Sequence, residues 1–112
     1  MTKRYIPDTG DIVRVHFDVP AGGGLSDHKT AVVISPAAYN RRTGLFVCCA
    51  VTSAVKHYPF EVALQSAEPA VALADQVKSL DWANTKISRQ SKAGPTELAQ
   101  IRAKLHALLF KD

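Results

Sequence analysis

Cationic, hydroxyl and imidazole side chains stand in this sequence at the places where apolar segments begin or end. His28 and Lys29 precede one continuous apolar run, and Thr52 and Ser53 follow another. Groups at the ends of rigid strands can be held accurately enough to act together on one substrate. The candidates are, in chain order, His28, Lys29, Thr52, Ser53, Lys56, His57 and Lys78, together with one carboxylate, Asp75.

These residue types suit the cleavage of a phosphodiester. That reaction needs a base, an acid and a fixed cation that stabilises the charge developing on phosphorus. RNA supplies its own nucleophile in the 2′-hydroxyl, so no metal-activated water is required. The sequence has no P-loop, no Gly-x-Ser-x-Gly elbow, no His-Glu-x-x-His and no spaced cysteine pair, and it therefore predicts neither a metal nor a cofactor.

Each candidate also has a purely structural interpretation. Lys29, His28 and His57 could be solvated surface residues. Thr52 and Ser53 could cap a turn, as hydroxyl side chains commonly do.

Three further positions stand out by their surroundings. His16 shares the polar side of its segment with Arg14, and this pair could line a binding groove or only cover an exposed sheet. Asp75 interrupts an apolar segment, so its carboxylate needs a partner or solvent, and a functional site would provide one. We assign Trp82 to the hydrophobic core.

The elements that would position these groups are mostly strands. Residues 11–18 alternate between apolar and polar side chains, which predicts a half-buried strand. Residues 31–35 form a continuous apolar run, typical of a strand buried on both faces, with His28 and Lys29 at its mouth and a glycine-rich loop upstream. Further strands are expected at 45–51, 60–64 and 70–77, a short turn or helical turn at 37–40, a turn at 40–44, and a polar connection at 83–93.

The chain ends in a segment with helical periodicity. Gly94 can serve as the N-cap, Pro95 suits the first helical position, and Glu97 favours the positive N-terminal end. The apolar residues that recur at spacings of three and four predict a stripe facing the core, namely Leu98, Ile101, Leu105, Leu108 and Leu109. About five short strands and one helix predict a mainly β fold, a small and strongly curved β-barrel with the helix packed on it.

Length and composition indicate one globular domain over residues 1–112, with 46% hydrophobic and 21% charged residues. The formal net charge of +4 favours anionic partners. Cys48 and Cys49 are adjacent, and neighbouring side chains of a strand point to opposite faces, so we expect no disulfide and a reducing cytoplasm. We expect no signal peptide and no membrane-spanning segment.

With these residues laid out, the chain resembles the MazF/PemK family, the toxins of bacterial toxin–antitoxin pairs. The resemblance runs over nearly the whole length, and a set of segments in matching order and spacing is more specific than any single motif. The segments that carry it are residues 4–8, 10–13, 17–18, 28, 31–36, 39–40, 43–44, 52, 58–62 and 72–79.

The resemblance implies an SH3-like barrel of the MazF/CcdB type with a C-terminal helix, which assembles as a homodimer in the bacterial cytoplasm. It also implies metal-independent, sequence-specific cleavage of single-stranded RNA, with 2′,3′-cyclic phosphate and 5′-hydroxyl products. The implied partner is a cognate antitoxin whose acidic segment blocks the RNA groove. The basic charge of the chain agrees with both an RNA substrate and an acidic inhibitor.

The loop that carries the catalytic arginine of the family departs from the family pattern, Gly-x-Glu-Gln-x-Gly-x-Arg-Pro. Gly24 stands at the acidic position, Lys29 at the arginine and Thr30 at the proline, while the threonine partner is kept as Thr52. Lysine retains the charge but lacks the planar fork that can hold two phosphate oxygens. Activity could therefore be slower, depend on a neighbouring histidine, or be lost.

The resulting hypothesis for the site has Lys29 stabilising the phosphorane and Thr52 bonding a non-bridging oxygen. His28 or His16 would transfer protons. Phe17 would stack on a base and Asp75 would accept from a base edge. The remaining residues expected to contact RNA are Arg14, Ser53, Lys56, His57, Gln76 and Lys78.

Two functions of other classes stay open at this level. A family member with an altered loop could bind RNA or antitoxin without cutting. A toxin directed at gyrase, like CcdB, could share the fold, although the segments around Thr52 and 59–62 match the ribonuclease type.

Overall fold

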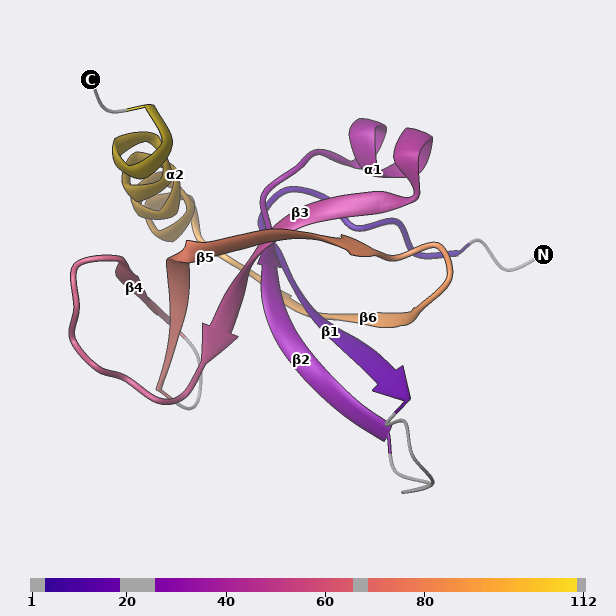
Figure 1. Ribbon diagram of the computed structural model, residues 1–112, viewed down its shortest axis with the longest axis horizontal. Helices are drawn as coiled ribbons and strands as arrows, with labels where there is room; N and C mark the ends of the chain where they lie inside the picture. The colour runs from indigo at the N-terminus through magenta and orange to yellow at the C-terminus, as the bar shows by residue number, and fades with distance from the viewer. Residues whose placement is uncertain (1–3, 19–25, 66–68, 111–112) are drawn as a thin grey trace.

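The structure is a computed structural model that describes residues 4–18, 26–65 and 69–110; for residues 17, 18 and 26–28 it describes only the backbone. Within these residues the chain forms strands and two helices, coloured along the chain in Figure 1. The strands are β1 (Asp11–Asp18), β2 (Ser26–Val33), β3 (Leu45–Thr52), β4 (Glu61–Leu64), β5 (Ala70–Asp81) and β6 (Lys86–Lys92). The helices are α1 (Ala37–Thr43) and α2 (Pro95–Phe110).

The strands form one antiparallel sheet in the order β4-β5-β3-β2-β1-β6. Strands β4 and β6 are its two edges, and the sheet twists strongly between them (Figure 1). The expected mainly β fold with a C-terminal helix is confirmed. The sheet is open rather than closed, so the expectation of a barrel holds only loosely.

The centre of the sheet is the pairing of β2 with β3, in which Val32 lies opposite Cys49 and Val33 opposite Cys48. Val32 and Cys49 belong to a core cluster on one face, and Val33 and Cys48 to a second cluster on the other face. All four side chains are fully buried. A ladder buried on both faces explains why these segments are continuously apolar.

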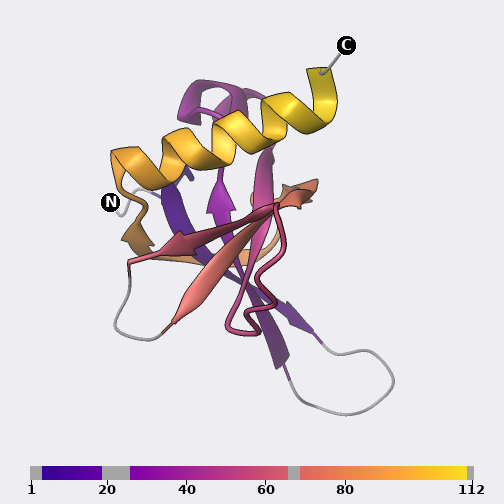
Figure 2. The ribbon, with the colours of Figure 1, turned by 90° about the vertical axis from the view of Figure 1, so that its left-hand side faces the viewer.

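Helix α2 lies across one side of the sheet and packs against β4 and β5 (Figure 2). Its first turn confirms the expected cap, because the Gly94 N–H donates to the Glu97 carboxylate at 2.9 Å. Such a contact from the third helical residue back to the N-cap satisfies a backbone donor that has no partner in the helix. Ile101 and Leu105 reach the core cluster that contains Val32.

The apolar stripe of α2 does not face the core along its whole length. Leu108 and Leu109 are 43% and 55% exposed, against 0% for Ile101 and 8% for Leu105. The helix extends past the sheet (Figure 2), so the residues that the structure describes leave its last turn exposed. The assignment of Leu108 and Leu109 to the core was therefore wrong.

Several element boundaries also differ from expectation; β5, for example, continues to Asp81. Strand β2 begins at Ser26, so Lys29 lies within the strand rather than at its mouth. The turn expected at 40–44 is the second half of α1, which ends where Gly44 adopts a left-handed φ of 74°. The polar segment 83–93 contains an edge strand, β6, which pairs with β1.

Asn40 joins the N-terminal segment, α1 and the end of β5 in a buried hydrogen-bond network. Its side-chain amide donates to the carbonyls of Pro7 (2.8 Å) and Ser35 (3.1 Å), and its side-chain oxygen accepts from the Ser35 hydroxyl (2.6 Å). The Asn40 backbone carbonyl accepts the Trp82 indole N–H at 2.7 Å. Every polar atom of this fully buried side chain is thus paired.

Replacing Asn40 by alanine removes three of these bonds and leaves buried partners without hydrogen bonds. We expect Asn40→Ala to lower the free energy of unfolding by about 2 to 4 kcal/mol. Arg41→Ala, at an exposed position of the same helix, is the matched control and should change it by less than about 0.5 kcal/mol. Urea unfolding of both variants measures this, and equal midpoints would contradict the structural role of Asn40.

Candidate functional site

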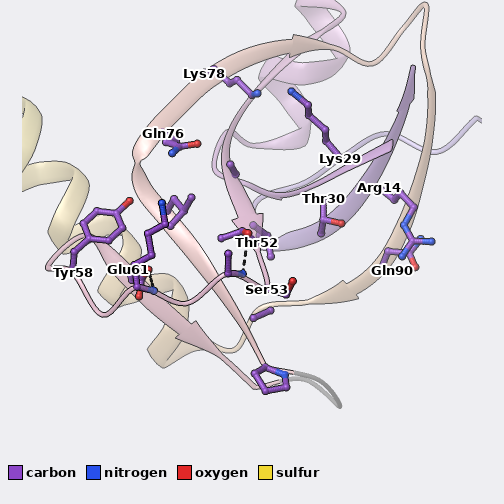
Figure 3. A pocket seen from close by; sticks show the side chains of 17 residues that line it. Arg14, Lys29, Thr30, Thr52, Ser53, Tyr58, Glu61, Gln76, Lys78 and Gln90 are labelled. Atoms are coloured by element: carbon purple, nitrogen blue, oxygen red, sulfur yellow. Dashed lines mark hydrogen bonds between the residues drawn. The ribbon is translucent and has the colours of Figure 1, made fainter. Parts of the chain in front are cut away.

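A polar groove of about 1100 Å³ crosses one end of the sheet (Figure 3). Strands β2, β3 and β5 form most of it, with contributions from β1, β4, β6 and the segment after β3. Its lining consists of Arg14, Lys29, Thr30, Ala50, Val51, Thr52, Ser53, Ala54, Lys56, Tyr58, Glu61, Pro69, Ala70, Leu73, Gln76, Lys78 and Gln90.

Lys29 and Thr52 line this groove from adjacent strands. Thr30 and Val51 are the last residues that pair in the antiparallel ladder of β2 and β3, and Lys29 and Thr52 are their immediate neighbours on the two strands. Because side chains alternate between the two faces of a strand, the two neighbours of this last pair both project to the face opposite to that of Thr30 and Val51. An ammonium and a hydroxyl group are thereby presented to the same space.

Lys78 approaches from the other side of β3. It pairs with Cys48, which shares a face of β3 with Ala50 and Thr52 because alternate residues of a strand point the same way. Lys29, Thr52 and Lys78 therefore lie on one face of the sheet, with Lys78 opposite Cys48 and Thr52 further along β3. In Figure 3 their amino ends point toward one another.

Strand β5 carries a bulge beside the groove. Cys49 pairs with Val77, but the next residue of β3, Ala50, pairs with Leu73, so residues 74–76 have no partners on β3. The Ala74 N–H instead donates to the Phe60 carbonyl at 3.0 Å. Extra residues bend a strand and redirect its side chains, and Figure 1 shows the sharp bend in β5. Gln76 enters the groove lining as a result.

The segment after β3 is held in shape by two side chains. The Thr52 hydroxyl oxygen accepts the Ala54 N–H at 3.1 Å, as in a common turn. Among the described residues the Thr52 hydroxyl proton has no acceptor, and it can be donated to a ligand. The Glu61 carboxylate accepts the N–H groups of Lys56 (2.8 Å) and His57 (2.9 Å), and His57 takes a left-handed φ of 59°.

Tyr58 connects the groove to Asp75 on the bulge of β5. Its hydroxyl donates to the Asp75 carboxylate at 2.8 Å. This bond raises the pKa of Tyr58 to about 12, because ionising the phenol would remove the donor and place two negative charges together. Tyr58 is therefore a neutral donor at physiological pH, and Asp75 has the partner that its position predicted.

The structure brings seven of the predicted residues into one groove: Arg14, Lys29, Thr52, Ser53, Lys56, Gln76 and Lys78. Three lie outside the groove lining: His16, His57 and Asp75. The predictions for the side chains of His28 and Phe17 lie outside the described residues.

Four polar lining residues were missed from the sequence: Thr30, Tyr58, Glu61 and Gln90. Tyr58 and Glu61 could have been found only by knowing that the segment between β3 and β4 folds over the groove. Gln90 lies in β6, whose mostly polar sequence is typical of a loop.

The groove carries a positive field. Its lining includes the cations of Arg14, Lys29, Lys56 and Lys78, and a single carboxylate, Glu61, among the described lining residues. Glu61 is already engaged by two backbone donors. A cleft lined mostly by one sign of charge concentrates ligands of the other sign, so the groove suits an anionic chain.

The described part of the chain also has thiols, metal-ligating residue types and two helices, which bear on other kinds of site. Burial raises the pKa of Cys48 to about 12 and of Cys49 to about 11, so neither thiol is a ready nucleophile. No three His, Cys, Asp or Glu side chains come together there as a metal-binding group. Neither described helix combines the length and apolar character needed to cross a bilayer.

Comparison with known families gives a match over most of the chain. Residues 8–109 match the family described as the PemK-like, MazF-like toxin of type II toxin–antitoxin systems. The matched span includes all the residues that line the groove.

Individual relatives agree with this match. The chain is 44% identical over 110 residues to the endoribonuclease toxin MazF of Escherichia coli K12, covering 97% of this chain and 99% of that protein. The crystal structure of MazE–MazF from Deinococcus radiodurans superposes with a TM-score of 0.83 at 41% identity, covering 97% of this chain and 100% of that one. The crystal structure of MazF from the same organism gives 0.81 at 42% identity, over 95% and 98% of the two chains.

The contact between Tyr58 and Asp75 can be tested by titration. At about pH 11 we expect Tyr58 to remain neutral in the native protein, whereas Asp75→Asn should return its pKa toward about 10 and ionise it. The near-ultraviolet absorbance of tyrosinate measures this. Tyr58→Phe, subtracted from each spectrum, isolates the Tyr58 signal, and a Tyr58 ionisation that Asp75→Asn leaves unchanged would show that the bond is absent.

Proposed function

The chain belongs to the PemK-like, MazF-like toxin family of type II toxin–antitoxin systems, and from this premise we propose that it is an endoribonuclease that cleaves single-stranded RNA. The cleavage takes place in the groove between β2, β3 and β5. The observation that supports the proposal is that Lys29 and Thr52, the neighbours of the last β2–β3 pair, both line one cationic groove.

The reaction needs no water in its first step. The ribose 2′-oxygen attacks phosphorus and gives up its proton to a base, the bond from phosphorus to the 5′-oxygen breaks, and that oxygen takes up a proton. The products are a 2′,3′-cyclic phosphate and a 5′-hydroxyl. Lys29 stabilises the added negative charge on the phosphorane, and the Thr52 hydroxyl donates to a non-bridging oxygen.

Proton transfer and base recognition stay predictions for individual side chains. We assign proton transfer to His28, with His16 as the alternative. We expect Phe17 to stack on a base and Asp75, held by Tyr58, to accept from a base edge. The other residues proposed to contact RNA are Arg14, Ser53, Lys56, His57, Gln76 and Lys78.

The same groove is the proposed binding site for an antitoxin. Structures that superpose on this chain are named as MazE–MazF assemblies. An acidic segment of a cognate antitoxin would compete with RNA for the cations that line the groove.

We further propose a homodimer in the bacterial cytoplasm. The exposed apolar end of α2, formed by Leu108, Leu109 and Phe110, is a surface that a second copy would cover. The two cysteines are unpaired, in keeping with a reducing compartment.

The proposal predicts how RNA is cut by the purified protein in EDTA. We expect 2′,3′-cyclic phosphate ends from the native protein, and a loss of roughly 100-fold or more in the rate for Lys29→Ala and for Thr52→Ala. Lys29→Arg should retain activity, because it keeps the charge and adds the planar fork. Sequencing the 5′ ends of the products reports both cleavage and base preference.

Arg42→Ala is the control, because it removes one exposed cation from α1, outside the groove. If Lys29→Ala and Thr52→Ala both cleave RNA as fast as the native protein, neither residue takes part in the mechanism. RNA that is bound in a salt-sensitive way but never cut would identify a catalytically impaired member of the family. Intact RNA together with inhibited DNA supercoiling would identify a gyrase-directed toxin.

A further inference from the structure

Arg14 has a property that the cleavage site leaves unexplained. It lies in the middle of β1, paired with Thr30 of β2 on one side and Ser88 of β6 on the other. Its Nε atom is buried and has no hydrogen-bond partner within residues 4–18, 26–65 and 69–110. A buried donor without a partner is costly. The Arg14 side chain also lines the groove, where its other N–H groups can donate to an acceptor on a ligand.

Gln90 stands beside Arg14 because of an irregularity in β6. Ile12 pairs with Ser91 and Val13 with Arg89, so Gln90 is an extra residue with no partner on β1. Its side-chain nitrogen donates to the Ser88 hydroxyl at 3.0 Å. Figure 3 shows Gln90 and Arg14 together at one side of the groove, away from Lys29 and Lys78.

This part of the groove offers hydrogen-bond donors to an anion. Arg14 can only donate, and the Thr30 hydroxyl lies opposite it in register. The nearest carboxylate of β1, Asp11, projects to the other face with Val13 and is held there by Arg89 and Lys92 at 3.5 and 3.9 Å. No acidic side chain of the described groove lining competes for Arg14, since Glu61 is occupied elsewhere.

The geometry points to a second phosphate subsite, formed by Arg14, Thr30 and Gln90, which holds a backbone phosphate other than the one being cleaved. The inference rests on the proposed RNA substrate and adds a fixed contact along its chain. Lys29 and Thr30 are consecutive in β2, so their side chains leave the strand in opposite directions and serve different positions of the ligand. The planar guanidinium suits two oxygens of one phosphate.

A phosphate-by-phosphate binding experiment tests the subsite. The probes are 2′-O-methyl oligonucleotides, which lack the nucleophile, each with one phosphate replaced by a neutral methylphosphonate. For the native protein we expect one position, distinct from the scissile phosphate, where neutralisation weakens binding roughly tenfold. Arg14→Ala should bind the unmodified probe roughly tenfold more weakly and should be insensitive to neutralisation at that one position.

Salt dependence and two further variants complete the test. Arg14→Ala should reduce the slope of log affinity against log salt by about 0.7, the value for one contact to a single strand. Arg14→Lys should restore most of this slope but not the full affinity, because it keeps the charge and loses the fork. Arg42→Ala should change neither quantity, and unchanged unfolding midpoints show that each variant is folded.

The possible results separate the subsite from the proposed function. Two results would show that the subsite is wrong while the ribonuclease proposal stands. In the first, Arg14→Ala lowers the affinity for every singly neutralised oligonucleotide by the same factor. In the second, neutralising each phosphate weakens binding to Arg14→Ala as much as it weakens binding to the native protein. If the native protein binds none of the oligonucleotides and cuts no RNA, both are overturned.

Discussion

The paired centre of β2 and β3 is the constraint on which the rest of the molecule depends. Val32 and Cys49 are buried on one face of this ladder, and Val33 and Cys48 on the other. A slip of one residue would exchange the two faces of a strand, and packing on both sides opposes such a slip. The register that results puts Lys29 and Thr52 on the same face, one residue beyond the last β2–β3 pair, so the core and the site are consequences of the same pairing.

Departures from regular pairing supply the polar side chains around this pair. The bulge in β5 turns Gln76 into the groove and frees Asp75 to accept from Tyr58. The bulge in β6 likewise leaves Gln90 without a partner on β1, and Gln90 lines the groove beside Arg14. Regular strands thus hold the two central groups rigidly, while local irregularities at both sides place the groups proposed to contact the rest of an RNA chain.

The sequence predicted the elements in which burial produces a strong pattern. The bounds of β1 and the cap of α2 at Gly94 are correct, because alternation and capping chemistry are local signals. The edge strand β6 was missed because it pairs with one neighbour only and is mostly exposed. Its sequence is therefore mostly polar, which is typical of a loop. Tyr58 and Glu61 were missed since their place in the groove depends on how a loop folds back, which no local pattern encodes. Leu108 and Leu109 carry the helical period past the end of the sheet, and period alone cannot show where the surface beneath a helix stops.

The central claim, that Lys29 and Thr52 act on the same phosphate, is tested most directly by a double-mutant cycle. The quantity to measure is kcat/KM for RNA cleavage by the native protein, by the two single alanine variants and by the variant that carries both changes. Groups that stabilise one transition state act as a unit. The account therefore predicts that kcat/KM of the double variant is only slightly lower than kcat/KM of the less active single variant. Losses that multiply independently would show that the two side chains serve separate steps, and would contradict the account.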